Sequence, residues 1–366
     1  MIEKKEKTFS VLLTITNQCN LKCRYCYEHN KNREEMSLDM GKTIISHLFE
    51  EMEEKEDTVL EFDFHGGEPL LNFSFIREIC EWTWRKTWKS KYRFFGTTNG
   101  TAWSSEIKKW FAANKDKISF ALSIDGTPRM NYENRGCILS GETIDFFAET
   151  WPKQPVKMTV SKETIKDMFE GIAYLHSKGF NISANLAYGM DWDDTWVDIY
   201  RRELDKLVRY YIASPHITPC SLFDHSLIGL LDESYVPRLC GAGKNMKSFD
   251  TNGQSYPCQM FGPNTLPEWK QIKDDFEDER NLQDAECLSC NIYKICSTCY
   301  GMNFIERGSV AKRDRRLCAC VKAEREALAT WKLHNIMAKD RATLNKSDYL
   351  ELKAIQKLKT ETESES

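Results

Sequence analysis

Three cysteines near the amino terminus have a spacing suited to iron–sulfur chemistry. Cys19, Cys23 and Cys26 form the pattern C-x3-C-x2-C directly after an apolar, strand-like run. A tight loop can bring three thiolates to three irons of one [4Fe–4S] cube, and the fourth iron is then open to bind and reduce another molecule. Taken alone, the pattern fits a zinc knuckle or three buried thiols equally well.

A second group of cysteines lies between residues 240 and 320. The chain has 14 cysteines and no secretion signal, so metal binding explains them better than disulfides do. Eight thiolates suit two tetrahedral zinc sites as well as iron–sulfur clusters, so their number leaves the metal open. The group consists of Cys240, Cys258, Cys287, Cys290, Cys296, Cys299, Cys318 and Cys320.

Short apolar runs alternate with longer amphipathic stretches ahead of this second group. The predicted strands are 10–16, 59–64, 92–98, 118–124, 156–161 and 180–188. The predicted helices are 38–55, 73–88, 104–114, 141–150, 163–178 and 194–213. Six successive β/α units indicate an α/β protein with a partial (β/α)6 TIM barrel. A barrel places its chemistry at the carboxyl ends of its strands, where the first three cysteines fall.

Composition divides the chain into three expected parts. Residues 1–215 form the barrel, 216–340 form a cysteine-rich domain with a closing helix at 321–339, and 341–366 form a charged, partly disordered tail. No stretch approaches the ~20 apolar residues that a membrane span needs. A formal charge of −4 gives no strong attraction to nucleic acid. We therefore expect a cytoplasmic protein that binds neither membrane nor nucleic acid.

Four motifs resemble those of the radical S-adenosylmethionine (SAM) superfamily. They are TNQCNLKCRYCY around the three cysteines, GGEP at 66–69, TTNG at 97–100 and SIDG at 123–126, each at the end of a predicted strand. The resemblance implies that Cys19, Cys23 and Cys26 hold a [4Fe–4S] cluster whose open iron chelates SAM. It further implies reductive cleavage of SAM to methionine and a 5′-deoxyadenosyl radical, which abstracts a hydrogen atom from the substrate.

The resemblance also implies residues around SAM. The segment Gly66, Gly67, Glu68 and Pro69 would contact the methionine amino group, and Ser123 and Ser161 the ribose. The glycines can equally form an ordinary turn, and the serines can cap strand ends. The motifs at the third and fourth strand ends add Asn99 and Asp125 to the expected cofactor site.

The order of the carboxyl-terminal spacings resembles the SPASM module of radical SAM peptide maturases. Carried over by position, Cys240, Cys258 and Cys299 would serve one auxiliary [4Fe–4S] cluster. A second auxiliary cluster would take Cys287, Cys290, Cys296 and Cys318. The interval from Cys296 to Cys299 is one residue shorter than in the family, and Cys220 and Cys320 are alternative ligands.

This resemblance implies a ribosomally made precursor peptide as substrate, modified by a thioether or other crosslink. Because the chain begins directly at its first strand, we expect leader recognition to come from a separate leader-binding protein, from the surface of the SPASM module, or from strand addition at a sheet edge. We expect a reductase, flavodoxin or ferredoxin as electron donor. One alternative is the oxidation of cysteine or serine by anaerobic sulfatase-maturating enzymes, but these carry an aspartate base where Gln259 stands, and an amide cannot accept the proton. Another is a non-enzymatic, zinc-stabilised binding protein, which leaves the GGEP, TTNG and SIDG segments unexplained. Further candidates for the cavity wall are Tyr27, His65, Asp191, Asp193 and His225.

Overall fold

The computed structural model describes residues 6–53, 55, 57–238, 240–267 and 271–365, with side chains to residue 360. It divides the chain into two compact units. The first contains Met1–Ile124, Arg135–Lys157 and Gly241–Glu277, and the second contains Asp125–Asn134, Met158–Cys240 and Asp278–Ser366. These bounds differ from the expected divisions after residues 215 and 340, because the chain returns to the first unit after residue 240.

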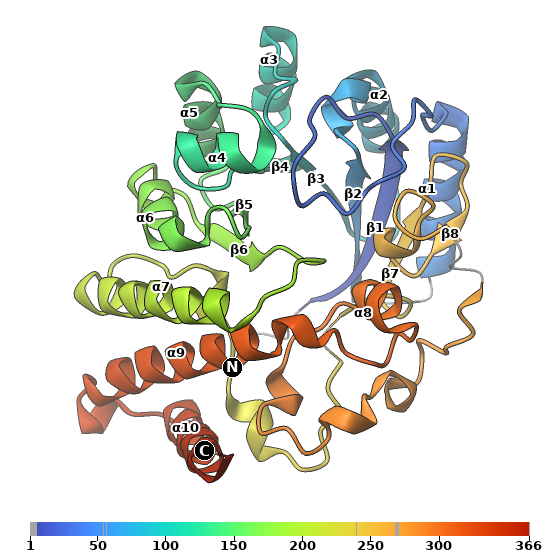
Figure 1. The fold of residues 1–366 in the computed structure, drawn as a ribbon. Coiled ribbons are helices and arrows are strands. Elements are labelled where there is room, and N and C mark those ends of the chain that lie inside the picture. Colours follow the sequence, from blue (N-terminus) through green and yellow to red (C-terminus); the bar gives the residue numbers. More distant parts are fainter. Residues whose placement is uncertain (1–5, 54, 56, 239, 268–270, 366) are drawn as a thin grey trace. The chain divides into compact units, whose positions relative to one another are not determined.

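A six-stranded sheet forms the centre of the first unit (Figure 1). Its order is β4-β3-β2-β1-β7-β8, and neighbouring strands are parallel except for β7 and β8. The strands are β1 (Lys7–Thr16), β2 (Thr58–Gly66), β3 (Tyr92–Thr98), β4 (Ile118–Leu122), β7 (Met246–Phe249) and β8 (Ser255–Tyr256). A parallel bridge between Ser123 and Lys157 continues the order towards β5 (Val156–Val160). The carboxyl ends of β1 to β4 therefore share one edge of the sheet.

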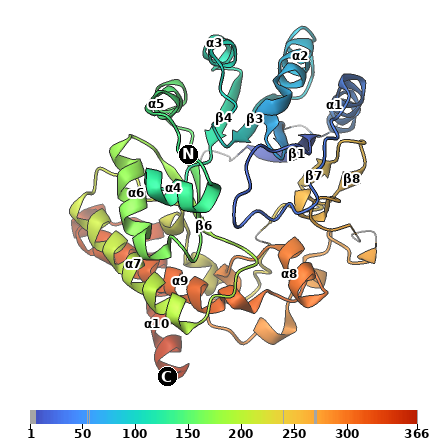
Figure 2. The same ribbon diagram turned by 45° about the horizontal axis from the view of Figure 1, so that its top comes forward.

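Four helices lie side by side along one face of this sheet (Figure 2). Aromatic rings form much of the interface: Phe62 of β2 lies 5.7 Å from Phe49 of α1, and Phe120 of β4 lies 4.9 Å from Phe111 of α3, between ring centroids. Side chains alternate along a strand, so Asp63 and His65 of β2 point to the opposite face. The helices are α1 (Leu38–Met52), α2 (Phe73–Trp84), α3 (Ser105–Asn114) and α5 (Gly141–Thr150).

The second unit contains the strand pair of β5 and β6 (Ile182–Leu186) and most of the remaining helices. Helices α7 and α9 are joined by polar contacts, since Tyr200 donates a hydrogen bond to Glu324 (2.8 Å) and Arg201 pairs with Glu326 (2.5 Å). The helices are α4 (Pro128–Arg135), α6 (Met168–Ser177), α7 (Asp194–Ala213), α8 (Tyr300–Arg307), α9 (Cys318–Met337) and α10 (Lys346–Glu365).

The predicted α/β fold with a partial barrel is confirmed. All six strands and six helices expected before residue 215 are present, and β3, α5 and α7 have the predicted ends. The sequence patterns did not predict α4, α8, or the short strands β7 and β8. No helix in the described part of the chain has both the length and the apolar character that crossing a bilayer requires.

The carboxyl-terminal segment differs from the expected disordered tail. Residues 346–365 form α10, and Ser366 lies outside the described residues. Ala354, Ile355 and Leu358 are 0–2% exposed, and Glu351 accepts hydrogen bonds from Ser226 (2.9 Å) and Lys332 (2.8 Å). The charged composition concealed this apolar stripe, whose spacing suits one face of a helix.

We expect Ile355→Ala to lower the free energy of unfolding by about 2–5 kcal/mol, because it removes buried methyl groups from the packed face of α10. The adjacent exposed substitution Gln356→Ala should change it by less than about 0.5 kcal/mol. Denaturant titration of both variants measures the difference. Equal stability of the two would mean that α10 does not pack on the unit.

Candidate active site

The loop after β1 carries the three amino-terminal cysteines, which are partly exposed and form no disulfide. The amide of Cys26 donates to the carbonyl of Cys23 (3.1 Å), which closes a turn between them. Burial raises the pKa of Cys19, and the nearby Glu68 and Cys26 raise it further. Lys31 hydrogen-bonds to Cys26 and adds a positive charge beside these thiols. No sequence signal pointed to Lys31, because a lone lysine in a loop has no diagnostic spacing.

The glycine pair explains how a second loop reaches the cysteines. Gly66 has φ +149°, and a Cβ there would lie 2.1 Å from the carbonyl oxygen of Thr16. A Cβ on Gly67 would lie 2.2 Å from the carbonyl oxygen of Gln18. The two loops also share backbone hydrogen bonds, from Gly67 to Thr16 (3.0 Å) and from Glu68 to Gln18 (2.7 Å). Glycine at both positions therefore allows the two loops to lie this close to each other.

Glu68 is fixed in a buried position by the third strand end. Its side chain is 1% exposed, and its carboxylate accepts hydrogen bonds from the Thr98 hydroxyl (2.7 Å) and from the amides of Asn99 (2.7 Å) and Leu70 (3.1 Å). Burial raises the pKa of Glu68, against the effect of these bonds and of Arg135 nearby. The GGEP and TTNG segments thus meet at one carboxylate, as neighbouring ends of parallel strands allow. Pro69 and Asn99 are buried beside it.

Asp125 and Ser161 lie in the second unit, where both are fully buried. The Asp125 carboxylate accepts hydrogen bonds from the amide of Thr159 (2.8 Å) and the side-chain amide of Asn134 (3.2 Å). The Ser161 hydroxyl donates to Asn134 Oδ1 (2.6 Å). These groups, predicted as cofactor contacts, thus join α4 to β5, and Asn134 was missed because it lies outside every motif. Ser123, in the first unit, is 8% exposed at the end of β4, where its amide donates to the Thr98 carbonyl (2.8 Å).

Four cysteines of the second unit lie within electrostatic range of one another. Burial raises the pKa of Cys296, and Cys318 and Cys290 raise it further; burial also raises the pKa of Cys287 to about 11, with Cys318 adding to it. Arg325, 1% exposed, holds the segment around Cys296 by donating to the Ile295 carbonyl and the Ser297 hydroxyl (both 3.1 Å). A set of thiols alone suits an iron–sulfur cluster.

The other carboxyl-terminal cysteines separate into three environments. Cys299 lies near Cys240, and burial raises its pKa to about 11. Cys258 belongs to the first unit, near Tyr27. Cys220 and Cys320 are 0% exposed, with pKa values raised by burial to about 11 and about 12, and both lie near Glu324. Among the described residues, no three His, Cys, Asp or Glu side chains are grouped closely enough for a single metal ion.

The remaining candidates for a cavity wall have varied surroundings. Tyr27 hydrogen-bonds with Gln259, and His65 Nε2 lies 3.5 Å from Glu28 Oε1. Asp193 caps α7 by accepting the Thr195 amide (3.1 Å), whereas Asp191 is exposed. His225 lines a cavity of about 320 Å³ in the second unit, together with Tyr188 and Glu324. Tyr188 lies near Cys299 and Cys240, so the cavity adjoins that pair of thiols.

A sequence comparison identifies the family. The model of the radical SAM superfamily matches residues 13–202, more than half of the chain. The chain belongs to the radical SAM superfamily. As a radical SAM enzyme it uses a [4Fe–4S] cluster and SAM, which confirms the superfamily predicted from the four motifs.

Curated relatives of this radical SAM enzyme cover different parts of it. An uncharacterized protein of Methanocaldococcus jannaschii is 34% identical over 119 residues, 32% of this chain, and the chain spans only 38% of that relative's length. A cysteine-type anaerobic sulfatase-maturating enzyme of Clostridium perfringens is 22% identical, with 76% of this chain and 84% of the relative covered. The radical SAM cyclopropyl synthase TigE of Paramaledivibacter caminithermalis is 22% identical, with 88% and 74% covered.

Solved structures share the fold of this radical SAM enzyme. Native anSMEcpe with bound AdoMet and Kp18Cys peptide has a TM-score of 0.70 and 19% identity, covering 90% of this chain and 99% of that one. Streptococcus suis SuiB bound to its precursor peptide SuiA has a TM-score of 0.56 and 19% identity, covering 85% and 76%. The likeness extends beyond the barrel into the cysteine-rich part.

We expect Asp125→Asn to lower the free energy of unfolding of the radical SAM enzyme by about 1–3 kcal/mol, because an amide nitrogen cannot accept one of the two buried N–H bonds. Asp116→Asn, an exposed change of the same chemistry, should have almost no effect. Thermal or denaturant unfolding of both variants measures the loss. A variant Asp125→Asn as stable as the parent would show that this carboxylate does not hold α4 to β5.

Proposed function

We propose that this radical SAM enzyme modifies a ribosomally made precursor peptide by forming a thioether or another crosslink. The observation that carries the proposal is the presence of two thiol sets, a triad beside Glu68 in the first unit and a four-cysteine group in the second. The relatives add support, because SuiB is bound to a precursor peptide and anSMEcpe to a cysteine-containing peptide by name.

In this proposal the triad Cys19, Cys23 and Cys26 binds the cluster whose open iron takes SAM. When bound, the cluster and SAM together supply a radical that removes a hydrogen atom from the substrate. A carboxylate has about four acceptor positions, and protein donors occupy three of those of Glu68, so one is left for the SAM ammonium group. Gly66, Gly67 and Pro69 hold this carboxylate against the cysteine loop.

The other predicted cofactor residues divide into two roles. We assign Asn99 and Ser123, at the ends of β3 and β4, to direct contact with the cofactor. Asp125 and Ser161 act through Asn134, because their side-chain polar atoms are engaged with it in the second unit. They position the end of β5 and do not themselves need to touch the ribose.

Two auxiliary [4Fe–4S] clusters complete the proposal. Cys287, Cys290, Cys296 and Cys318 would hold one, and Cys240 and Cys299, which lie near each other, would serve the other. Such clusters supply one-electron acceptance, which a crosslink requires because the substrate gives up two hydrogen atoms, one as an atom and one as a proton plus an electron. Cys318 is a better ligand than Cys320, since it lies near Cys290 whereas Cys320 lies near Glu324.

Sulfatase-type oxidation of a cysteine or serine is the second candidate. A relative of this type aligns over 76% of the chain. The side chain after Cys258 is Gln259, and Tyr27 hydrogen-bonds with it. An amide cannot accept the proton that this oxidation releases, so the residue at the expected base position argues for crosslinking.

Partners follow from the same proposal. Radical SAM chemistry needs an electron donor, which we assign to a reductase, flavodoxin or ferredoxin. A separate leader-binding protein would recruit the peptide. None of the described cysteines of this enzyme forms a disulfide, which fits a reducing compartment and our inference of a cytoplasmic location.

Replacing Cys23 tests the triad. Cys23→Ala should abolish the formation of 5′-deoxyadenosine in anaerobically reconstituted protein, because the cluster loses one of three ligands, while iron bound by the carboxyl-terminal cysteines is retained. Cys80→Ala, at a fully buried position in α2, should cleave SAM normally. Chromatography of the products and iron analysis measure both effects. Unchanged cleavage by Cys23→Ala would remove the triad from the proposal.

Mass spectrometry of the peptide tests the reaction. A short cysteine-bearing peptide encoded beside this gene, incubated with the enzyme, SAM and reductant, should lose the mass of two hydrogen atoms and keep its sulfur. The same peptide with its cysteine replaced by alanine should be unchanged if the bond is a thioether. Loss of sulfur with gain of oxygen would instead identify the oxidation of a cysteine. An aldehyde that reacts with a hydrazine would identify the oxidation of a serine, which also removes two hydrogen atoms.

A further inference from the structure

A buried arginine lies beside the four-cysteine group of the second unit. Arg313 is 6% exposed, and its guanidinium hydrogen-bonds to the thiol of Cys296. It lies near Cys287 as well, where its charge lowers a thiol pKa that burial raises. Its Nη1 donates to the Tyr293 carbonyl (3.2 Å), and its guanidinium carbon lies 4.2 Å from the centre of the Tyr293 ring. These contacts hold a positive charge away from water and against the thiols.

One donor of this guanidinium has no partner. Within the described residues, Arg313 Nε is buried and makes no hydrogen bond. A buried N–H left unsatisfied is unfavourable, because the group has lost its hydrogen bond to water. Hydrogen bonds to the sulfurs of an iron–sulfur cluster are common and adjust its reduction potential. A cluster or ligand sulfur at the four cysteines would therefore supply the acceptor that the protein lacks.

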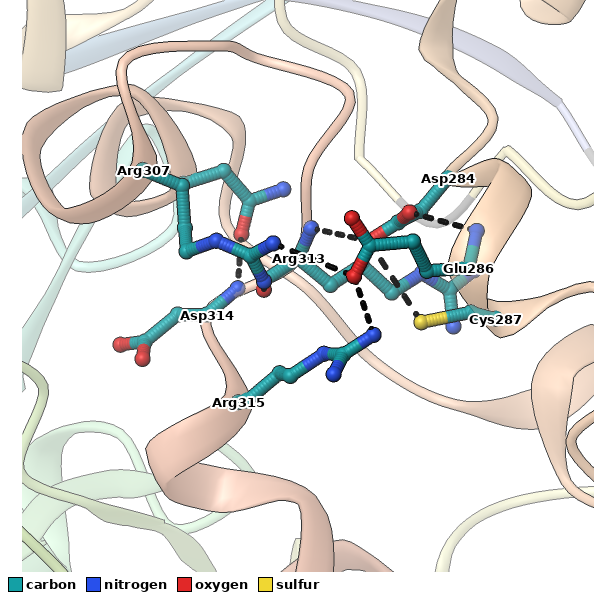
Figure 3. Close-up of polar contacts among 8 residues, drawn as sticks. Asp284, Glu286, Cys287, Arg307, Arg313, Asp314 and Arg315 are labelled. Carbon is teal, nitrogen blue, oxygen red and sulfur yellow. Dashed lines mark hydrogen bonds and ion pairs between the residues drawn. The ribbon is translucent and has the colours of Figure 1, made fainter.

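Asp284 places a negative charge at the same site (Figure 3). It is 2% exposed, and its Oδ2 accepts the amide of Arg313 (2.8 Å) and the thiol of Cys287 (3.5 Å). A cysteine binds a metal as a thiolate, so this thiol donor is lost when Cys287 acts as a ligand. The carboxylate then faces a second anion in a buried position. Arg313, which contacts the same group, supplies the compensating charge.

The neighbouring arginines are placed differently. Arg307 and Arg315 both pair with Glu286, at 3.4 Å for Arg307, as Figure 3 shows. Their side chains are 25% and 53% exposed, so solvent screens them more than Arg313. Arg315 also acts on a proposed ligand, since its charge lowers the pKa of Cys318, but its side chain is exposed. It therefore offers a control with the same charge that solvent screens more strongly.

We propose that Arg313 raises the reduction potential of the auxiliary cluster held by Cys287, Cys290, Cys296 and Cys318, and that Asp284 lowers it. Reduction adds a negative charge to the cluster, which a buried cation favours and a buried carboxylate opposes. Arg313 is thus a positioning residue for electron acceptance. This inference rests on the proposed auxiliary cluster.

The test is a redox titration of the full-length chain. Alanine at Cys19, Cys23 and Cys26 leaves only the auxiliary clusters, and the wave that Cys318→Ala removes identifies the cluster in question. Followed by electron paramagnetic resonance, Arg313→Met should lower the reduced-to-oxidised ratio at fixed potential about tenfold, equivalent to about 59 mV for one electron. Arg313→Lys should restore most of the ratio, and Arg315→Met should lower it much less than Arg313→Met does, because solvent screens the exposed Arg315 charge.

Asp284→Asn provides the opposite test, because removing a negative charge should raise the ratio. If this network had a purely structural role, the two substitutions would not shift the reduction potential in opposite directions. An unchanged potential in Arg313→Met with full iron content would overturn the inference. Should Arg313→Met fail to retain iron, a lowered or unchanged potential in Asp284→Asn would overturn it. Parent protein without iron at the four cysteines would overturn the auxiliary-cluster assignment too, whereas SAM cleavage by the intact enzyme tests the triad independently.

Discussion

The contact between the loops after β1 and β2 is the constraint on which the rest of the first unit depends. Neither Gly66 nor Gly67 can carry a side chain, because a Cβ would come within 2.2 Å of a carbonyl oxygen. Backbone hydrogen bonds across this contact join the cysteine loop to a parallel sheet whose core is filled with aromatic rings. A flexible segment would pay a large ordering entropy to present three thiols at once, and this contact removes much of that cost.

The second unit holds its thiols by another means. The segment from Asp278 to Leu317 consists largely of single turns, with α8 as its longest helix. Buried polar side chains supplement a small apolar core there. Asn303, for example, donates to the Val310 carbonyl (2.9 Å) and accepts the Asp314 amide (2.9 Å). Fully satisfied networks of this kind specify one arrangement of the backbone, which suits a site that must keep four sulfurs in place.

The sequence predicts the elements whose signals are local. The strand 92–98 and the helices 141–150 and 194–213 have clear periodicity and were predicted to the residue. The spacing of Ala354, Ile355 and Leu358 also fits a helix. We expected a disordered tail there only because of the charged residues around them, and α10 was therefore missed. The cysteine spacings likewise predicted which thiols gather in the second unit, while their roles as ligands stay predictions.

Contacts between residues far apart in the chain could not be predicted from the sequence. Nothing local links Arg313 to Asp284, 29 positions earlier, or Ser161 to Asn134, 27 positions earlier. Asp125 was expected at the cofactor because of its motif, and Ser161 because of the resemblance to the family. Their partners in α4 become apparent only when the chain has folded, since side-chain hydrogen bonds follow from tertiary position.

Helix α9 carries a consequence for how the enzyme matures. It begins at Cys318, and its Arg325 donates hydrogen bonds to Ile295 and Ser297, on either side of Cys296. Its Glu324 accepts a hydrogen bond from Tyr200 of α7. The backbone that bears these sulfurs is thus anchored by bonds between protein groups. In a zinc finger, by contrast, metal capture and chain folding are one event. A cluster at these cysteines would therefore need to order less of the chain on binding than zinc orders in a zinc finger.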